Sequence, residues 1–244
     1  MRAIRVHEDG IRLEEVPRPA AAEGEVLVRV HAAAITRDEL EWPADRLPAI
    51  PSYELSGVTE DGEAVIALTP FDRDGCAAEW VAVPRALLAP KPAALDHVTA
   101  AALPMPGLTA WQGLFGHGAL LRGERVLVRG ASGGVGHIAV QLARWAGAEV
   151  VDGGPADLVF DTAGNERPAD AVRYVTVVAD TADGLYFVVE PRGSELAELA
   201  RLADERILQP QVDSVFGLTE FEAAYERCMS RGKRGKVVLR VDAG

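Results

Sequence analysis

Cysteine is scarce in this chain. Its 244 residues include two cysteines, Cys76 and Cys228, which lie far apart and form no Cys-x-x-Cys spacing. That number and spacing exclude a zinc knuckle and argue against a disulfide framework. We therefore expect no structural metal and a protein that resides in a reducing compartment, the cytoplasm.

Positive charge and long apolar runs are also in short supply. Lys and Arg number 25 against 37 Asp and Glu, which gives a formal net charge of −12. Nucleic acids and anionic membranes both reward positive surfaces, so we expect neither as a partner. No run approaches the roughly 18 apolar residues of a membrane-spanning helix, and the first residues form no apolar signal core. A small-molecule substrate remains the expected partner.

Two kinds of pattern divide the chain. Residues 1–96 contain short alternating strands punctuated by Pro and Gly, as in a small irregular barrel. After Asp96, helical patterns alternate with short Val-rich runs that are typical of buried parallel strands. We expect helices over 194–203 and 218–229, the second with a capping box between Thr219 and Glu222.

A glycine turn, Gly130 to Gly136, lies between a predicted strand (125–129) and a predicted helix. Glycines let the backbone approach a ligand closely, and a helix N-terminus attracts the pyrophosphate of a dinucleotide. A tight strand–helix turn in an enzyme that binds no nucleotide is the alternative, and it stays open. The expected cofactor-binding residues of the turn are Ser132, Gly133, Gly134, Val135 and Gly136.

The segment that follows this helix is too short for an intact nucleotide-binding domain. Six residues, 152–157, separate a predicted strand at 149–151 from the next strand, Leu158-Val159-Phe160. A crossover between parallel strands takes about a dozen residues or more, which six residues rich in Gly and Pro cannot supply. We predict that a helix–strand unit is missing from the half of the sheet that holds the adenosine ribose.

Six segments in order resemble one family: EVLVRVHAAAITRDEL, PKPAALDHVTAAALPMPGLTAWQGL, RVLVRGASGGVGHIAVQLARWAGAEVV, VFDTAG, FVVEP and RGKVVLRV. They are similar to the zinc-free quinone oxidoreductase and enoyl reductase branch of the medium-chain dehydrogenase/reductase superfamily, in a shortened form. The resemblance implies an α/β protein with a GroES-like β-barrel catalytic domain plus a truncated Rossmann-type dinucleotide-binding domain. The barrel would comprise residues 1–96 completed by 194–244, and the Rossmann-type domain residues 97–193, with ligands in the cleft between them.

The resemblance also implies hydride transfer from NADPH or NADH to an activated carbon–carbon double bond or a quinone. Where the zinc-dependent branch has Gly-His-Glu, with a metal-binding His, this chain has Ser52-Tyr53-Glu54, so we expect no zinc. Thr109 resembles a family residue near the nicotinamide and diphosphate, although a helix-surface hydroxyl would explain it equally well. Asp152 follows the second strand, where an acidic residue favours a plain ribose 2′-OH over a 2′-phosphate.

Three residues are candidate acids or bases, each with a structural alternative. Tyr53 could protonate an enolate or pack as an aromatic under the barrel. Glu54 matches an acidic position near the cleft or forms a salt bridge, and Asp38 is a candidate catalyst or a helix-dipole partner.

Asp161 follows a strand end, where open sheets bind ligands, or belongs to an ordinary turn. The basic residues 233–236 are expected to lie in a solvated hairpin.

Two functions from different classes follow. The first is a zinc-independent NAD(P)H reductase of an enone or quinone. The second is a cofactor-free derivative that uses the same cleft for cyclisation, isomerisation or elimination, or for ligand binding alone, because fold does not determine function. A homodimer that pairs edge strands such as 185–189 is expected by analogy.

Overall fold

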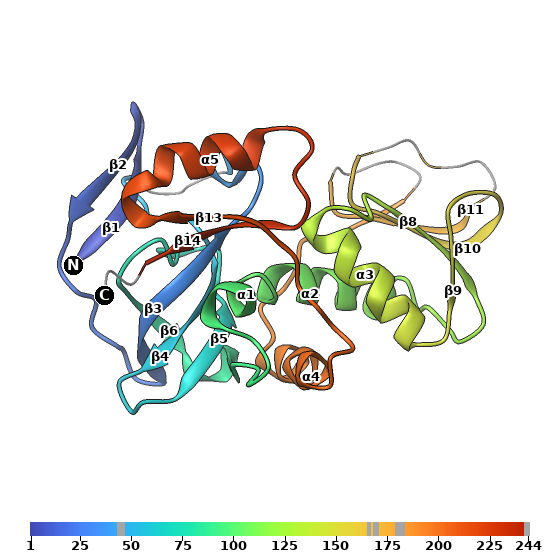
Figure 1. Cartoon of the computed structure of the whole chain (residues 1–244), viewed down its shortest axis with the longest axis horizontal. Helices are drawn as coiled ribbons and strands as arrows, with labels where there is room; N and C mark the ends of the chain where they lie inside the picture. Colours follow the sequence, from blue (N-terminus) through green and yellow to red (C-terminus); the bar gives the residue numbers. More distant parts are fainter. Residues whose placement is uncertain (43–46, 165–166, 168–170, 179–183, 242–244) are drawn as a thin grey trace.

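The computed structural model describes residues 1–42, 47–164, 167, 171–178 and 184–241. A twisted barrel sheet and a parallel sheet lie at opposite ends of the molecule, and helices α1 (His97–Ala101), α2 (Pro104–Trp111) and α4 (Gly193–Asp204) lie between or beside them (Figure 1). Helix α5 (Phe221–Met229) runs across the barrel. The structure confirms the expected fold class.

Strand β3 (Glu25–Ile35) organises the barrel sheet. It pairs with β4 (Glu54–Thr59), with β6 (Trp80–Pro84) and with β14 (Lys236–Arg240), all antiparallel. Its apolar side chains alternate between faces, and a register shift after Val30 lets the long strand bend and change partners. The other barrel strands are β5 (Ala64–Leu68), β7 (Leu88–Pro90) and β13 (Val212–Gly217), and β1 (Arg2–His7) forms a separate hairpin with β2 (Gly10–Glu15).

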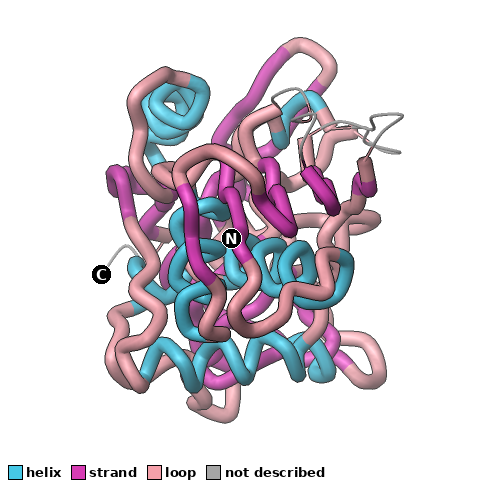
Figure 2. Tube along the Cα trace, turned by 90° about the vertical axis from the view of Figure 1, so that its right-hand side faces the viewer, coloured by secondary structure: helices cyan, strands magenta, loops and turns pink. Residues whose placement is uncertain are grey.

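The second sheet is parallel throughout and has the strand order β12-β11-β10-β8-β9. Its strands are β8 (Arg125–Arg129), β9 (Glu149–Val151), β10 (Ala156–Asp161), β11 (Ala171–Thr176) and β12 (Leu185–Tyr186). Helix α3 (Gly134–Trp145) packs on the face that carries Val126 and Val128. Figure 2 views the molecule from the end that holds this sheet.

The link between β9 and β10, residues 152–155, contains no helix, as predicted from its length. It nevertheless joins two parallel strands, which lie on either side of β8, so the premise that so short a segment cannot do this was wrong. The link runs from the end of β9, a strand of three residues, to the start of β10. It therefore has to return only about 10 Å along the strand direction, and it crosses two strand spacings of nearly 5 Å each. Five Cα–Cα steps span roughly 17 Å, which is enough.

One hydrophobic cluster extends through both halves. It contains Ile66 and Leu68 of the barrel strand β5 together with Leu158 and Phe160 of β10. Helices α2, α3 and α4 contribute to the same cluster, among them Leu199 of α4. The cluster on the other face of the parallel sheet is small and consists of strand residues, including Val159 and Tyr174.

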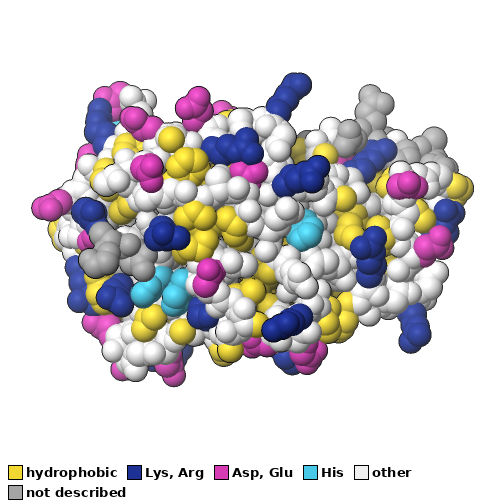
Figure 3. All heavy atoms as spheres, in the orientation of Figure 1, with side chains coloured by type: hydrophobic (Ala, Val, Ile, Leu, Met, Phe, Trp, Pro, Cys, Tyr) yellow, Lys and Arg dark blue, Asp and Glu magenta, His cyan; other side chains and the backbone are white. Residues whose placement is uncertain are grey.

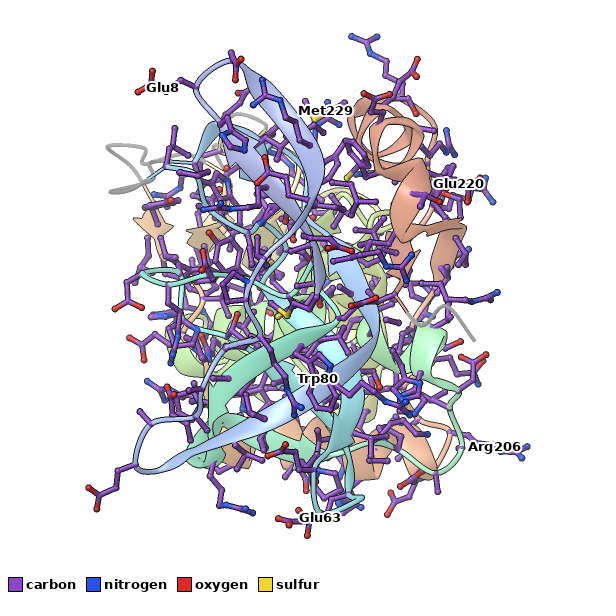
Figure 4. All side chains as sticks on the ribbon, turned by 90° about the vertical axis from the view of Figure 1, so that its left-hand side faces the viewer. Glu8, Glu63, Trp80, Arg206, Glu220 and Met229 are labelled. Carbon is purple, nitrogen blue, oxygen red and sulfur yellow. The ribbon has the colours of Figure 1, made fainter. Side chains whose placement is uncertain are left out.

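The C-terminal helix begins later than predicted. A 3-10 turn, Leu218–Glu220, precedes α5, and the carboxylate of Glu220 accepts a hydrogen bond from the backbone N–H of Gly217 at 2.7 Å. Glu220 is labelled in Figure 4, beside the ribbon that leads into α5. The expected cap between Thr219 and Glu222 was wrong, because Thr219 lies inside the first turn and not before it.

The surface is mixed in character. On the face drawn in Figure 3, acidic and basic side chains are interspersed among small apolar patches. In the described part of the chain, no helix has the length and apolarity needed to cross a bilayer.

We predict opposite effects of alanine at two glycines of one helical segment, Gln112–His117. A Cβ on Gly113 would overlap the ring of Phe160, which is fully buried, whereas a Cβ on Gly116 would meet nothing within 4 Å. Gly113→Ala should lower the free energy of unfolding by about 1–3 kcal/mol, as overpacking does. Gly116→Ala should leave it unchanged or raise it by up to about 1 kcal/mol. Urea unfolding of both variants measures the difference, and equal effects would contradict the tight contact with Phe160.

Candidate active site

The glycine turn has the geometry predicted from its sequence. Gly130 has a φ of 79°, in the left-handed region that favours glycine. A Cβ on Gly136 would overlap the carbonyl oxygen of Gly130, so the turn can close this tightly only with glycine at that position. The turn therefore places the N-terminus of α3 directly beyond the carboxyl end of β8.

These residues fit a dinucleotide diphosphate. The first N–H groups of a helix have no partner within the helix, and its positive dipole end attracts an anion. Gly133 is the N-cap of α3, and Gly134, Val135 and Gly136 follow in its first turn. Ala131 and Ser132 are exposed beside them. A phosphate group could thus accept hydrogen bonds from the backbone amides at this end of α3.

The adenosine side of this cradle is open. Within the described residues β9 is the edge of the sheet, which agrees with the predicted loss of a helix–strand unit. An open depression of about 710 Å³ adjoins this edge. Its lining includes Ala131 of the turn, Arg144 of α3, and Asp152 with Gly153 at the end of β9. Asp152 is exposed there, at the strand end where its sequence position predicted a ribose contact.

A buried ion pair joins the cradle to the barrel. The ammonium group of Lys236, in the first residue of β14, lies 2.8 Å from Oε1 of Glu54, in the first residue of β4. The methylene stem of Lys236 lies over Gly134, where a Cβ would be 3.0 Å from its Cδ. The backbone N–H of Gly235 also donates to the carbonyl of Ser132 at 3.3 Å. The last barrel strand thus touches the glycine turn directly.

Each member of the pair has a second polar partner. Oε2 of Glu54 accepts a hydrogen bond from the backbone N–H of Met105 at 2.9 Å. Lys236 donates to the hydroxyl of Thr36 at 3.0 Å. Oε1 of Glu54 is fully buried, and its ionic partner among the described residues is the Lys236 ammonium group.

The electrostatics of Glu54 depend on Lys236. Burial raises the pKa of Glu54, because a charge is poorly solvated there, and the nearby Lys236 ammonium and the Met105 amide oppose that rise. Its side chain has no exposed surface. Among the described residues, Lys236 is therefore the cation that favours the carboxylate form of Glu54.

A second buried acid, Glu39, lies in the same region. Burial raises the pKa of Glu39 to about 7, against the opposing effects of the Thr36 amide, Lys236 and Tyr225. The hydroxyl of Tyr225 donates to its Oε1 at 2.9 Å, and the N–H of Thr36 donates to its Oε2 at the same distance. Two carboxyl groups thus share the field of one buried lysine.

Tyr53 belongs to a group of three aromatic rings. It stacks with Trp42 at a centroid distance of 5.8 Å and meets Phe71 edge-on at 5.2 Å. All three rings are partly buried and pack against the main hydrophobic cluster. Such a group can receive a flat apolar ligand while the phenol keeps a polar end.

Two other predicted site residues, Asp38 and Thr109, differ in their exposure to solvent. Asp38 lies on an exposed turn with a φ of 63°, and a guanidinium nitrogen of Arg37 is 3.7 Å from its carboxylate. Thr109 is buried and donates to the carbonyl of Met105 in the previous helical turn, at 2.6 Å, so its hydroxyl is not on the helix surface.

Asp161 is fully buried at the end of β10. It accepts hydrogen bonds from the hydroxyl of Tyr174 at 2.7 Å and from the backbone N–H of Ala163 at 2.9 Å. Burial and Asp161 together raise the pKa of Tyr174 to about 12, so its phenol stays protonated. This carboxylate orders the end of the strand.

The sequence analysis missed Lys236, Thr36 and Glu39. Residues 233–236 were expected to form a solvated hairpin, but Lys236 is 8% exposed, so this expectation was wrong for it. The available signal was its position: Lys236 opens an apolar run, Val237-Val238-Leu239, that is typical of a buried strand. A lysine at the entrance of such a strand requires a buried counter-charge.

The described residues contain no group of three His, Cys, Asp or Glu side chains that could hold a metal ion. His31 stacks on His97 at a centroid distance of 4.3 Å, and the hydroxyl of Ser56 lies 2.8 Å from Nδ1 of His97. The absence of zinc from the reaction stays a prediction.

Comparisons with known proteins agree with this architecture. A family model described as "Zinc-binding dehydrogenase" matches residues 180–239. An Arthroderma benhamiae protein named "Probable zinc-binding oxidoreductase, mitochondrial" is 29% identical over 306 positions, covering 95% of this chain and 92% of the relative. Because 306 exceeds the 244 residues of this chain, the relative contains segments that are missing here.

Two quinone oxidoreductases are also similar. The rat protein is 36% identical over 172 positions, which cover 62% of this chain and 52% of the relative. The Thermus thermophilus enzyme, solved alone and with NADPH, is 30% identical, with a TM-score of 0.83 and coverage of 99% of this chain and all of the other. The chain therefore belongs to the medium-chain dehydrogenase/reductase superfamily, in its quinone oxidoreductase-like branch.

Proposed function

We propose that this protein is an NAD(P)H-dependent reductase of an activated carbon–carbon double bond or a quinone, and that it works without zinc. The observation that carries the proposal is the glycine turn, in which Gly130 and Gly136 permit a closure that exposes the N-terminus of α3. The similar Thermus enzyme was solved with NADPH, which supports a nicotinamide cofactor.

Each part of the cofactor has candidate partners. The amides at the start of α3 would hold the diphosphate, and the depression beside β9 would receive the adenosine, with Asp152 toward the ribose. The nicotinamide, when bound, supplies the hydride. The protein contributes position and a water-poor environment, which account for much of the rate in such a transfer.

The substrate and its proton donor would come from the barrel side of the cleft. The rings of Trp42, Tyr53 and Phe71 offer an apolar surface for a flat enone or quinone. A reduction that adds hydride to one carbon leaves negative charge that requires a proton, and the Tyr53 phenol can donate one. Glu54 and Lys236 lie in the adjacent buried network and set its electrostatic field.

One observation favours a second candidate, a cofactor-free enzyme or binding protein that uses this cleft. The described structure shows no strand beyond β9, so the adenosine would have protein on fewer sides than in a complete sheet. Glu54 and Tyr53 would then act as acid and base in an isomerisation, elimination or cyclisation.

Calorimetric titration with NADH and NADPH separates the two functions. We expect micromolar binding with a preference for NADH, because Asp152 repels a 2′-phosphate. Asp152→Ser should raise the affinity for NADPH relative to that for NADH by about tenfold, which corresponds to about 1.4 kcal/mol of binding free energy. Glu149→Gln is the matched control, since it removes the same charge from the same depression and should leave the preference unchanged. No binding of either dinucleotide at millimolar concentration would instead support the cofactor-free function.

Tyr53→Phe should lower kcat with an enone by about 10²-fold or more, the usual contribution of a positioned acid. The phenyl ring keeps the contacts with Trp42 and Phe71, so the Kd for NADH should stay close to wild type. Tyr186→Phe, at an exposed tyrosine, is the control. Steady-state kinetics with unchanged kcat would assign the proton to solvent or to another group.

We also propose a homodimer that pairs along β12, the outer strand of the parallel sheet. Leu185 and Tyr186 of this strand are exposed, and so is Val188 just after it. Burying such residues against a second copy would remove apolar surface from water. Light scattering after size exclusion should give twice the chain mass, and Tyr186→Lys should give a monomer. A monomeric wild-type protein would contradict the dimer.

A further inference from the structure

A hollow of about 440 Å³ lies at the barrel end of the molecule, away from the parallel sheet. The segment 16–20 after β2, the loop 73–75 and strand β6 border it together with Arg5 of β1. Figure 4 views the molecule from this end and labels Trp80, which belongs to the lining. The volume is within the range of small-molecule sites, roughly 300–1,000 Å³.

The lining carries more positive than negative charge, although the chain as a whole has a net charge of −12. Its charged side chains are three arginines, Arg5, Arg18 and Arg73, and one acid, Asp74. The carboxylate of Asp74 accepts a hydrogen bond from the backbone N–H of Ile50 at 3.1 Å, which ties it to the neighbouring loop. Guanidinium groups that converge on one hollow favour an anionic ligand, because hydrogen bonds between charged groups are the strong ones.

Each of the three guanidinium groups is held by an acid that is not part of the lining. The pairs are Arg5 with Glu14 at 3.4 Å, Arg18 with Glu60 at 2.5 Å and Arg73 with Glu25 at 2.5 Å. These contacts position the groups before a ligand arrives, which lowers the entropy that binding costs. Each acid engages a single nitrogen of its arginine, and a guanidinium has five N–H donors, so donors remain for a ligand.

The hollow also offers apolar surface. The guanidinium carbon of Arg18 lies 3.6 Å from the centroid of the Trp80 ring, a cation–π contact that fixes both side chains. Three aliphatic side chains, Val16, Ile50 and Val81, belong to the same lining. A ligand that matches this surface therefore combines an anionic group with an apolar body.

We propose that this hollow binds a small organic anion, whose carboxylate or phosphate group is held by the three arginines and whose apolar part packs against the aliphatic side chains. The guanidinium fork matches the oxygens of either headgroup. The site does not depend on the proposed reductase, because its residues belong neither to the glycine turn nor to the aromatic group around Tyr53.

Calorimetric titration with benzoate and phenyl phosphate tests the site. Benzamide is the uncharged counterpart of benzoate, and inorganic phosphate is an anion without an apolar body. We expect a Kd of about 0.1–1 mM for at least one of the organic anions. Benzamide and inorganic phosphate should bind about tenfold more weakly or not at all. The tighter organic anion identifies the headgroup.

Substitutions with opposite effects assign the binding to the hollow. Arg73→Met should weaken it about tenfold, since it removes a charged donor. Glu25→Gln should strengthen it several-fold, because it removes the acid that competes for Arg73 while the amide oxygen still accepts a hydrogen bond. Arg18→Met, at a more exposed arginine, should also weaken it and serves if Arg73→Met does not fold. Arg12→Met is the matched control, because Arg12 pairs with Asp9 outside the hollow, and its affinity should match wild type.

The outcomes separate this inference from the proposed function. Failure of both organic anions to bind at millimolar concentration would overturn the inference, and so would equal affinity for benzamide. Affinity that survives in both Arg73→Met and Arg18→Met would place the anion elsewhere, and competition with NADH would place it at the glycine turn. Either result would also overturn the inference. Failure of NADH to bind would count against the reductase alone.

Discussion

The ion pair between Lys236 and Glu54 connects the two halves of this protein at its functional centre. Lys236 opens the last barrel strand, and its stem packs on Gly134 of the glycine turn. An ion pair buried from water is costly unless each member has further polar partners. Thr36, just after β3, and the Met105 amide of α2 supply these partners. The pair therefore joins the end of β3, α2 and β14, beside the hydrophobic cluster that extends through both halves.

The parallel sheet shows how much of a nucleotide-binding domain can be removed. The short β9 and the link at 152–155 let the chain step past β8 without a helical crossover. The main hydrophobic cluster lies on the opposite face, around Phe160 and α3, and continues into the barrel. The core and the glycine turn are both in place, and an open depression lies beside β9.

The charged groups beside the glycine turn are buried and close to one another. Glu39 and Glu54 are both buried, and one lysine serves both. In such surroundings a carboxyl group changes its protonation state when a nearby charge moves by a few ångströms. Burial, more than residue type, distinguishes the groups that can respond to a ligand.

Local sequence patterns were enough to predict the α/β class, the strand–glycine turn–helix unit and the absence of a helix after β9. These features depend on periodicity, glycine geometry and chain length over a few residues. The tertiary structure alone decided that Lys236 is buried beside Thr36, 200 residues away, and that Tyr225 donates to Glu39, 186 residues away. It also decided that Asp161 faces Tyr174 at the end of β10. A charged residue has the same local pattern whether it meets solvent or a counter-charge, and only the packing of distant strands selects between them.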